Sequence, residues 1–161
     1  LDPELALSYI NKGLLEIILK NTKGALKLFK NALELVEKDK NNDIIMLNIA
    51  MCQLYLNNYN ETIRSLNHLK EDSAKKFQAL GSAYYYIERY EEAIEAYSWA
   101  TILQRQPKTF LNLALAQNRL NLKQDAAKSF SKAKKLDPEA TMPREPLLPR
   151  FRTVPYSQDE L

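Results

Sequence analysis

A pattern of small and aromatic residues recurs four times along this chain. Its clearest copy lies in the stretch YYYIERYEEAIEAYSWA, where Ala93, Tyr97 and Ala100 share one face of a predicted helix. The equivalent short residues are Ala25, Thr62, Ala93 and Ala126, at spacings of 37, 31 and 33 residues. Units of this length that repeat in tandem stack on one another and bury a continuous core. The pattern therefore predicts a repeat protein.

Each repeat is predicted to be a pair of antiparallel helices. The chain has only three glycines, and four of its seven prolines fall between Pro143 and Pro155, so helix-forming residues dominate up to residue 136. Gly81 on one helix and Ala93 on the next are small, so the two helices are expected to approach closely while large rings fill the gaps beside them. Most of the aromatic rings in the quoted stretch are therefore interpreted as core rather than as a stacking surface for bases or cations.

The repeated pattern resembles the tetratricopeptide repeat, whose period is 34 residues. The matching residues of the third unit are Leu80, Gly81, Tyr84, Ala93, Tyr97 and Ala100. The second unit is degenerate, with Thr62 where alanine is usual. The resemblance implies an all-α, right-handed solenoid of four helical hairpins in a domain over residues 1–138. Its units are expected at about 4–38, 43–70, 73–106 and 107–138, followed by a proline-rich extended tail over 139–161.

The residues of the chain offer little for catalysis. One histidine, His68, and one cysteine, Cys52, cannot form a Cys/His metal site, and three isolated glycines cannot cradle a phosphate. Cys52 is interpreted as a core residue and fits a reducing compartment. With a net charge of only +3 and no run of 18 apolar residues, we expect a cytoplasmic, non-catalytic protein that needs no cofactor or metal. We expect neither membrane insertion nor nucleic-acid binding.

Three asparagines occupy equivalent positions in the first helix of their repeats. Asn11, Asn48 and Asn112 each stand two residues before the small residue of the unit, where the third unit has Ala79. In such a solenoid the first helices line a concave surface. An amide both donates and accepts hydrogen bonds, so a row of amides can bind the backbone of an extended peptide. The row resembles the asparagine ladder in the tetratricopeptide superhelix of O-linked N-acetylglucosamine transferase, which implies an adaptor that binds an extended segment of another protein.

A carboxylate clamp for the C-terminus of a partner is a narrower possibility for the concave face. The carboxylate clamp of chaperone-binding tetratricopeptide domains maps onto Ile10, Leu14, Asn48, Lys75 and Ala79, and only Asn48 and Lys75 match it. Because a carboxylate needs the paired cations, that class is rejected, and Lys75 stays a candidate contact on the concave face.

A second stretch is similar to the tetratricopeptide chaperones of type III secretion translocators. The similarity covers about 30 residues and rests on Tyr97, Trp99, Pro107 and Phe110. It implies a chaperone for a secreted or unfolded client as an alternative function.

The last predicted helix is strongly basic. Residues 108–138 hold seven Lys and Arg against two Asp, a net +5, and Lys128, Lys132 and Lys135 share one helix face. These three cations are either a solvated helix end or a patch for an acidic partner. The patch favours a further alternative, a structural scaffold subunit of a larger complex that uses its C-terminal end.

The tail is too apolar for an ordinary linker, and its prolines preclude a long helix. Its apolar residues are Leu147, Leu148, Phe151, Val154 and Tyr156. We expect them to dock on the repeats, either over the last helix pair, in the asparagine-lined groove as a competitor of partners, or on a neighbouring copy. A disordered linker is the alternative. The final residues Gln158–Leu161 are similar to the Lys/His-Asp-Glu-Leu retrieval signal, with glutamine in place of the basic residue.

Overall fold

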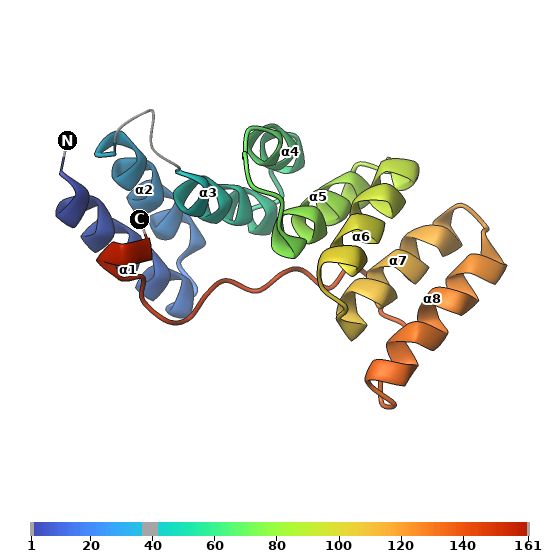
Figure 1. The fold of residues 1–161 in the computed structure, drawn as a ribbon. Coiled ribbons are helices and arrows are strands. Elements are labelled where there is room, and N and C mark those ends of the chain that lie inside the picture. The colour runs from blue at the N-terminus through green and yellow to red at the C-terminus, as the bar shows by residue number, and fades with distance from the viewer. Residues whose placement is uncertain (1, 37–41, 161) are drawn as a thin grey trace. The chain divides into compact units, whose positions relative to one another are not determined.

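The computed structural model describes residues 2–36 and 42–160, and within them the regular structure is helical (Figure 1). Leu161, the last residue of the segment that is similar to a retrieval signal, lies outside this range. The helices are α1 (Pro3–Ile18), α2 (Thr22–Glu34), α3 (Asp43–Tyr55), α4 (Tyr59–Asn67), α5 (Ala74–Tyr86), α6 (Tyr90–Leu103), α7 (Pro107–Arg119), α8 (Lys123–Leu136) and the 3-10 helix η1 (Gln158–Glu160). They pack as four consecutive hairpins, which confirms the predicted fold class. None of the described helices is long and apolar enough to span a bilayer.

The chain divides into two compact units. Unit 1 combines Leu1–Glu71 with Arg150–Leu161, and unit 2 is Asp72–Pro149. Each unit holds two helical hairpins and part of the tail. The predicted boundary between a 1–138 repeat domain and a 139–161 tail stays a prediction.

The turn inside each hairpin uses one residue in the left-handed conformation. It lies two residues after the end of the first helix, and the four are Lys20, Asn57, Glu88 and Asn121, with φ between 58° and 63°. A left-handed residue at this position ends a helix by redirecting the chain. None of the four is a glycine. Because other residues take the left-handed conformation, the four tight turns do not depend on the chain's three glycines.

The core of unit 2 shows why a glycine stands in α5. Tyr97 on α6 is fully buried, and its hydroxyl lies 3.0 Å from Ser82 Oγ. A Cβ at Gly81 would lie 2.6 Å from the Tyr97 ring, so only glycine leaves room for it. Trp99 differs from Tyr97, because it stacks on Phe77 at 6.2 Å between ring centroids and stays 49% exposed.

Unit 1 repeats this arrangement between its first two helices. Phe29 on α2 is fully buried, and a Cβ at Gly13 on α1 would lie 2.6 Å from its ring. Phe29 belongs to a core cluster that also contains Ile10, Leu14, Ala25, Ala32, Ile45, Ile49 and Cys52. We call this set the unit 1 core.

Candidate peptide-binding site

In unit 2, one asparagine holds one residue of the tail by its backbone. Asn112 on α7 is 1% exposed. Its Nδ2 donates to the Leu147 carbonyl at 2.9 Å, and its Oδ1 accepts from the Leu147 N–H at 2.8 Å. We call this pair of bonds an amide clamp, because a single amide satisfies both backbone groups of one residue. Leu147 as a whole is 39% exposed, so part of it stays open to solvent while the clamp holds its backbone.

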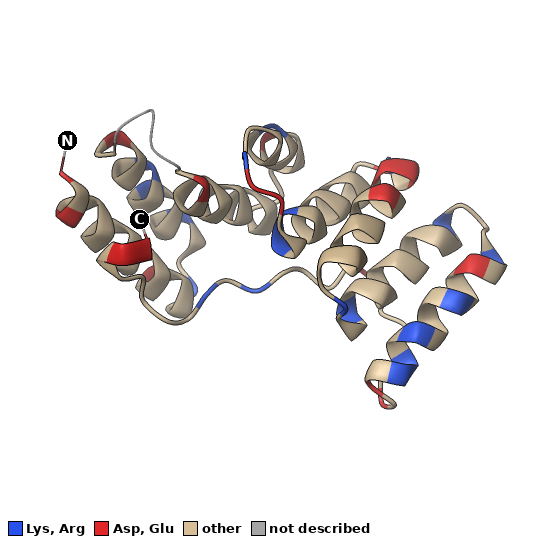
Figure 2. Cartoon of the chain, in the orientation of Figure 1, with Lys and Arg blue, Asp and Glu red and all other residues tan. Residues whose placement is uncertain are grey.

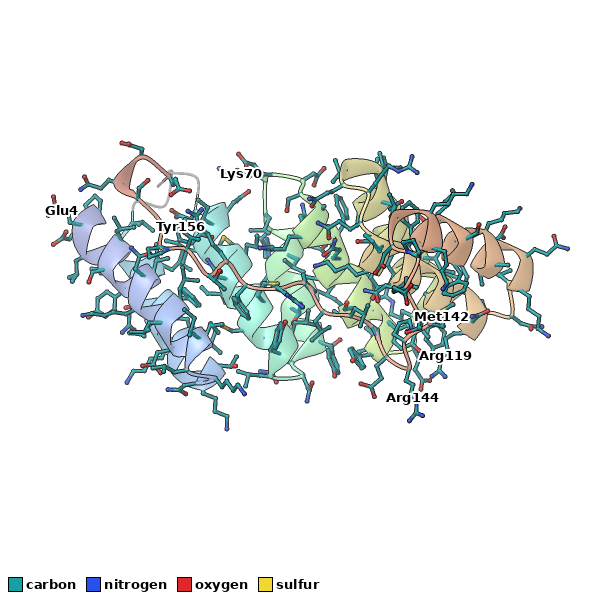
Figure 3. The ribbon with its side chains drawn as sticks, turned by 90° about the horizontal axis from the view of Figure 1, so that it is seen from below. Glu4, Lys70, Arg119, Met142, Arg144 and Tyr156 are labelled. Atoms are coloured by element: carbon teal, nitrogen blue, oxygen red, sulfur yellow. The ribbon has the colours of Figure 1, made fainter. Side chains whose placement is uncertain are left out.

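In unit 1, Asn11 on α1 forms a second amide clamp with the same geometry. Its Nδ2 donates to the Tyr156 carbonyl at 3.0 Å, and its Oδ1 accepts from the Tyr156 N–H at 2.8 Å. Figure 3 shows Tyr156 on the segment that runs beside α1. Two asparagines at equivalent positions of different repeats thus bind two tail residues alike.

The remaining predicted positions of the row have other surroundings. Asn48 is 5% exposed, and its Nδ2 donates to the Ile44 carbonyl of its own helix α3 at 3.0 Å. Ala79 on α5 is fully buried, and Lys75 on the same helix is half-buried. The structure therefore brings Asn11 and Asn112 to the tail, while the amide nitrogen of Asn48 is engaged within α3.

The apolar tail residues differ in their contacts. Phe151 and Tyr156 pack against the unit 1 core, and the Phe151 ring lies 5.3 Å from the Tyr55 ring at an interplanar angle of 49°. Leu148 is half-buried, whereas Val154 is 61% exposed.

Three further tail residues are buried, although the sequence did not predict them to dock because they are not large apolar side chains. They are Ala140, Pro146 and Pro149. Ala140 packs with Phe110, Leu111 and Ala133, and so covers apolar surface of the last hairpin. Prolines in a segment with extended backbone can pack without leaving an N–H unsatisfied, which is the signal that could have identified them.

The end of the tail is fastened by an arginine, in a group of contacts that we call the Arg152 latch. The Arg152 guanidinium donates to Glu160 Oε1 at 2.6 Å and to the carbonyls of Val154 and Pro155 at 2.8 and 3.1 Å. It also lies 4.2 Å from the centroid of the Tyr156 ring. The Ser157 N–H donates to Glu160 at 2.9 Å. Together these contacts fold the last residues of the tail around the residue that Asn11 holds.

The latch is expected to open in acid. The hydrogen bond from Arg152, followed by that from the Ser157 N–H, lowers the pKa of the Glu160 carboxyl from 4.5 to about 2. Since the folded pKa is below the ordinary value, the stabilisation is fully present above pH 4.5 and is lost as the pH falls toward 2. A carboxyl titration by NMR should find the depressed pKa in the wild type and a pKa closer to the ordinary value in Arg152→Gln, where only the hydrogen bonds from Ser157 still lower it. A wild-type midpoint at the ordinary value would contradict the latch.

The predicted basic patch lies along the exposed side of α8, where Figure 2 shows several bands of Lys. Lys128 pairs with Asp125 at 3.4 Å, and the Lys132 ammonium lies 5.8 Å from the centroid of the Phe110 ring. Lys135 is exposed. Two of the three cations therefore have contacts within unit 2.

Neither Cys52 nor His68 takes part in the hydrogen bonds of the clamps. Cys52 is fully buried in the unit 1 core, and burial raises the pKa of its thiol to about 12, so the thiol stays protonated. His68 follows the last residue of α4. Within residues 2–36 and 42–160, no group of three or more His, Cys, Asp or Glu side chains is placed to hold a metal ion.

Comparison with known proteins agrees with this architecture. Residues 77–101, which cover most of α5 and most of α6, match the family model described as Tetratricopeptide repeat. The chain has the tetratricopeptide-repeat fold. Among solved structures, MamA 41-end from Desulfovibrio magneticus RS-1 shares this tetratricopeptide fold with a TM-score of 0.74 and 23% identity, over 85% of this chain and 76% of that one.

Another structure, described as YrrB, a TPR protein with an unusual peptide-binding site, has a TM-score of 0.71 and 16% identity. The match covers 86% of this chain and 72% of that chain. No curated protein sequence matches this chain.

Proposed function

We propose that this tetratricopeptide chain is a non-catalytic interaction module that binds an extended segment of another protein. The binding residues are the asparagines of the first helices, Asn11, Asn48 and Asn112, with Lys75 as a further contact. The observation that carries the proposal is the pair of amide clamps. In each unit, an asparagine at the same repeat position satisfies both backbone groups of one tail residue.

The chemistry of the clamp suits a partner rather than only a structural contact. An extended chain has an N–H and a C=O at every residue that must be hydrogen-bonded when water is excluded. One asparagine amide supplies a hydrogen-bond donor and an acceptor to the backbone of the bound residue and makes no required contact with its side chain. The same position can therefore bind segments of many sequences. The described peptide-binding site of YrrB, a protein of the same fold, is consistent with such a use.

In this proposal the tail takes the place of the partner. Leu147 and Tyr156 occupy the two clamps, so a partner has to compete with a segment of the same chain. A tethered competitor is present at a high effective concentration, which lowers the apparent affinity for a partner. The module would therefore respond only to segments that bind better than the tail, or to conditions that release it.

Selection of peptides from a displayed random library against the full chain tests the proposal. The affinities are then compared in a chain that ends at Glu145 and so lacks both clamped tail residues. In this shortened chain we expect Asn112→Ala to lower the affinity for the selected peptides about 5- to 150-fold, because two hydrogen bonds of about 0.5–1.5 kcal/mol each are lost without any change in the competing tail. Asn118→Ala, an exposed asparagine of the same helix, is the matched control and should bind like the wild type. Equal binding by Asn112→Ala, Asn11→Ala and the wild type would contradict the proposed function.

A further inference from the structure

The two amide clamps differ in what surrounds the residue that they hold. At Asn112 the clamped residue, Leu147, is 39% exposed. At Asn11 the Tyr156 ring packs against the unit 1 core, and the Arg152 guanidinium lies 4.2 Å from the ring centroid on the tail side. At the second clamp, Asn11 therefore holds the backbone of a residue whose ring is itself packed on a core cluster.

Unit 1 has a second anchor five residues earlier in the tail. Phe151 packs against the same core and lies 5.3 Å from the Tyr55 ring of α3. A tilted aromatic pair at this distance is favourable beyond its buried area. Between the two anchors the side chains of Thr153, Val154 and Pro155 are exposed, so they add little to selectivity.

The spacing of the anchors suits an extended segment. Five residues of extended chain reach at most about 18 Å, whereas five residues of an α-helix rise only about 7.5 Å. Pro155 also biases the residue before it, Val154, toward extended backbone. In the tail itself residues 151–156 form no helix, since its helical residues begin at Gln158.

From these contacts we infer that unit 1 is specific for an extended partner segment that carries two aromatic residues separated by four others, with Phe151–Tyr156 as its intramolecular stand-in. This inference rests on the proposed function, because it names the class of segment that the Asn11 clamp accepts. Tyr55 and the unit 1 core receive the first ring. Asn11 and the same core receive the residue that carries the second.

The test uses the full chain and a fluorescent peptide with the sequence of residues 148–160, LPRFRTVPYSQDE. The chain variant Phe151→Ala weakens the tethered tail but leaves Asn11 and Tyr55 in place. Its anisotropy-measured affinity for the peptide is expected to be at least tenfold higher than that of the wild-type chain. Equal affinities in the two chains would overturn the inference.

Substitutions in the peptide distinguish specific binding of the aromatic residues from non-specific apolar binding. They also leave the protein itself unchanged, so they cannot unfold it. Against the Phe151→Ala chain, a peptide with Phe151→Ala should bind at least tenfold more weakly than the parent peptide. The matched control Val154→Ala removes an apolar side chain that is 61% exposed and should bind like the parent. Undiminished binding of the Phe151→Ala peptide would overturn the inference.

One more variant distinguishes the inference from the proposed function beneath it. Asn11→Ala, added to the Phe151→Ala chain, should weaken the parent peptide at least fivefold. If Asn11→Ala has no effect while Phe151→Ala in the peptide weakens binding, Asn11 does not bind the peptide backbone and the proposed function is wrong at this clamp. The inference that unit 1 binds aromatic residues would then still hold. If the wild-type chain is a dimer in light scattering that Phe151→Ala dissociates, the tail links two copies, and its role as an intramolecular stand-in is overturned.

Discussion

Tyr97→Ala is expected to lower the free energy of unfolding by about 3–5 kcal/mol, the usual cost of emptying a buried aromatic site. Tyr97 is fully buried over Gly81, so its removal leaves a cavity between α5 and α6. The change also removes the hydroxyl that lies 3.0 Å from Ser82 Oγ. Burial raises the pKa of this phenol, and the neutral ring therefore contributes packing and one hydrogen bond but no charge. Urea unfolding followed by circular dichroism measures the loss.

Trp99→Ala is the matched control on the same helix. Trp99 is larger than Tyr97 but 49% exposed, so less apolar area returns to water when it is removed. We expect a cost below half of that for Tyr97→Ala. Equal costs for the two changes would contradict the assignment of Tyr97, rather than Trp99, to the core.

The repeat pattern was sufficient to predict the helical hairpins. Gly81 lies against Tyr97, and Gly13 lies against Phe29 in the same way in unit 1. The pattern indicated the small residues but not which ring each of them faces. Helix periodicity depends on short-range geometry that a sequence shows directly. The turns were harder to predict, because a left-handed residue such as Glu88 has no glycine to mark it.

The positions of the candidate site residues could be predicted better than their contacts. The repeat register picked out Asn11 and Asn112, which the structure brings to the tail. It also picked out Asn48, whose amide nitrogen bonds to its own helix. A side-chain rotamer depends on local packing, which the repeat register does not describe.

The Arg152 latch was not predictable from the sequence. It joins Arg152 to Glu160 and to backbone carbonyls within an irregular segment, where no periodicity sets which residues meet. Its existence depends on the turn that the chain makes after Pro155.

The narrower resemblance to secretion chaperones rests on residues with structural roles here. Tyr97 is buried, Phe110 is 4% exposed, and Pro107 is the first residue of α7, where its missing N–H costs nothing. Buried residues and a proline at a helix start indicate which fold the chain adopts, but not which protein it binds. A chaperone function therefore stays a prediction.

Replacing Asn11 and Asn112 together by alanine is expected to release the tail from both units. The double variant removes the four hydrogen bonds of the two amide clamps, each with a net value of about 0.5–1.5 kcal/mol, or about 2–6 kcal/mol together. Each single variant should free only the tail residue that its own asparagine holds. Asn118→Ala, on α7 but exposed, should free neither.

Amide hydrogen exchange at Leu147 and Tyr156 measures this release most directly, because both N–H groups donate to the clamping side chains. The account predicts that both amides are protected in the wild type and that both exchange at least tenfold faster in the double variant. Asn112→Ala alone should accelerate Leu147, and Asn11→Ala alone should accelerate Tyr156. If both amides keep their wild-type protection in the double variant, the asparagines do not hold the extended chain, and the central claim is wrong.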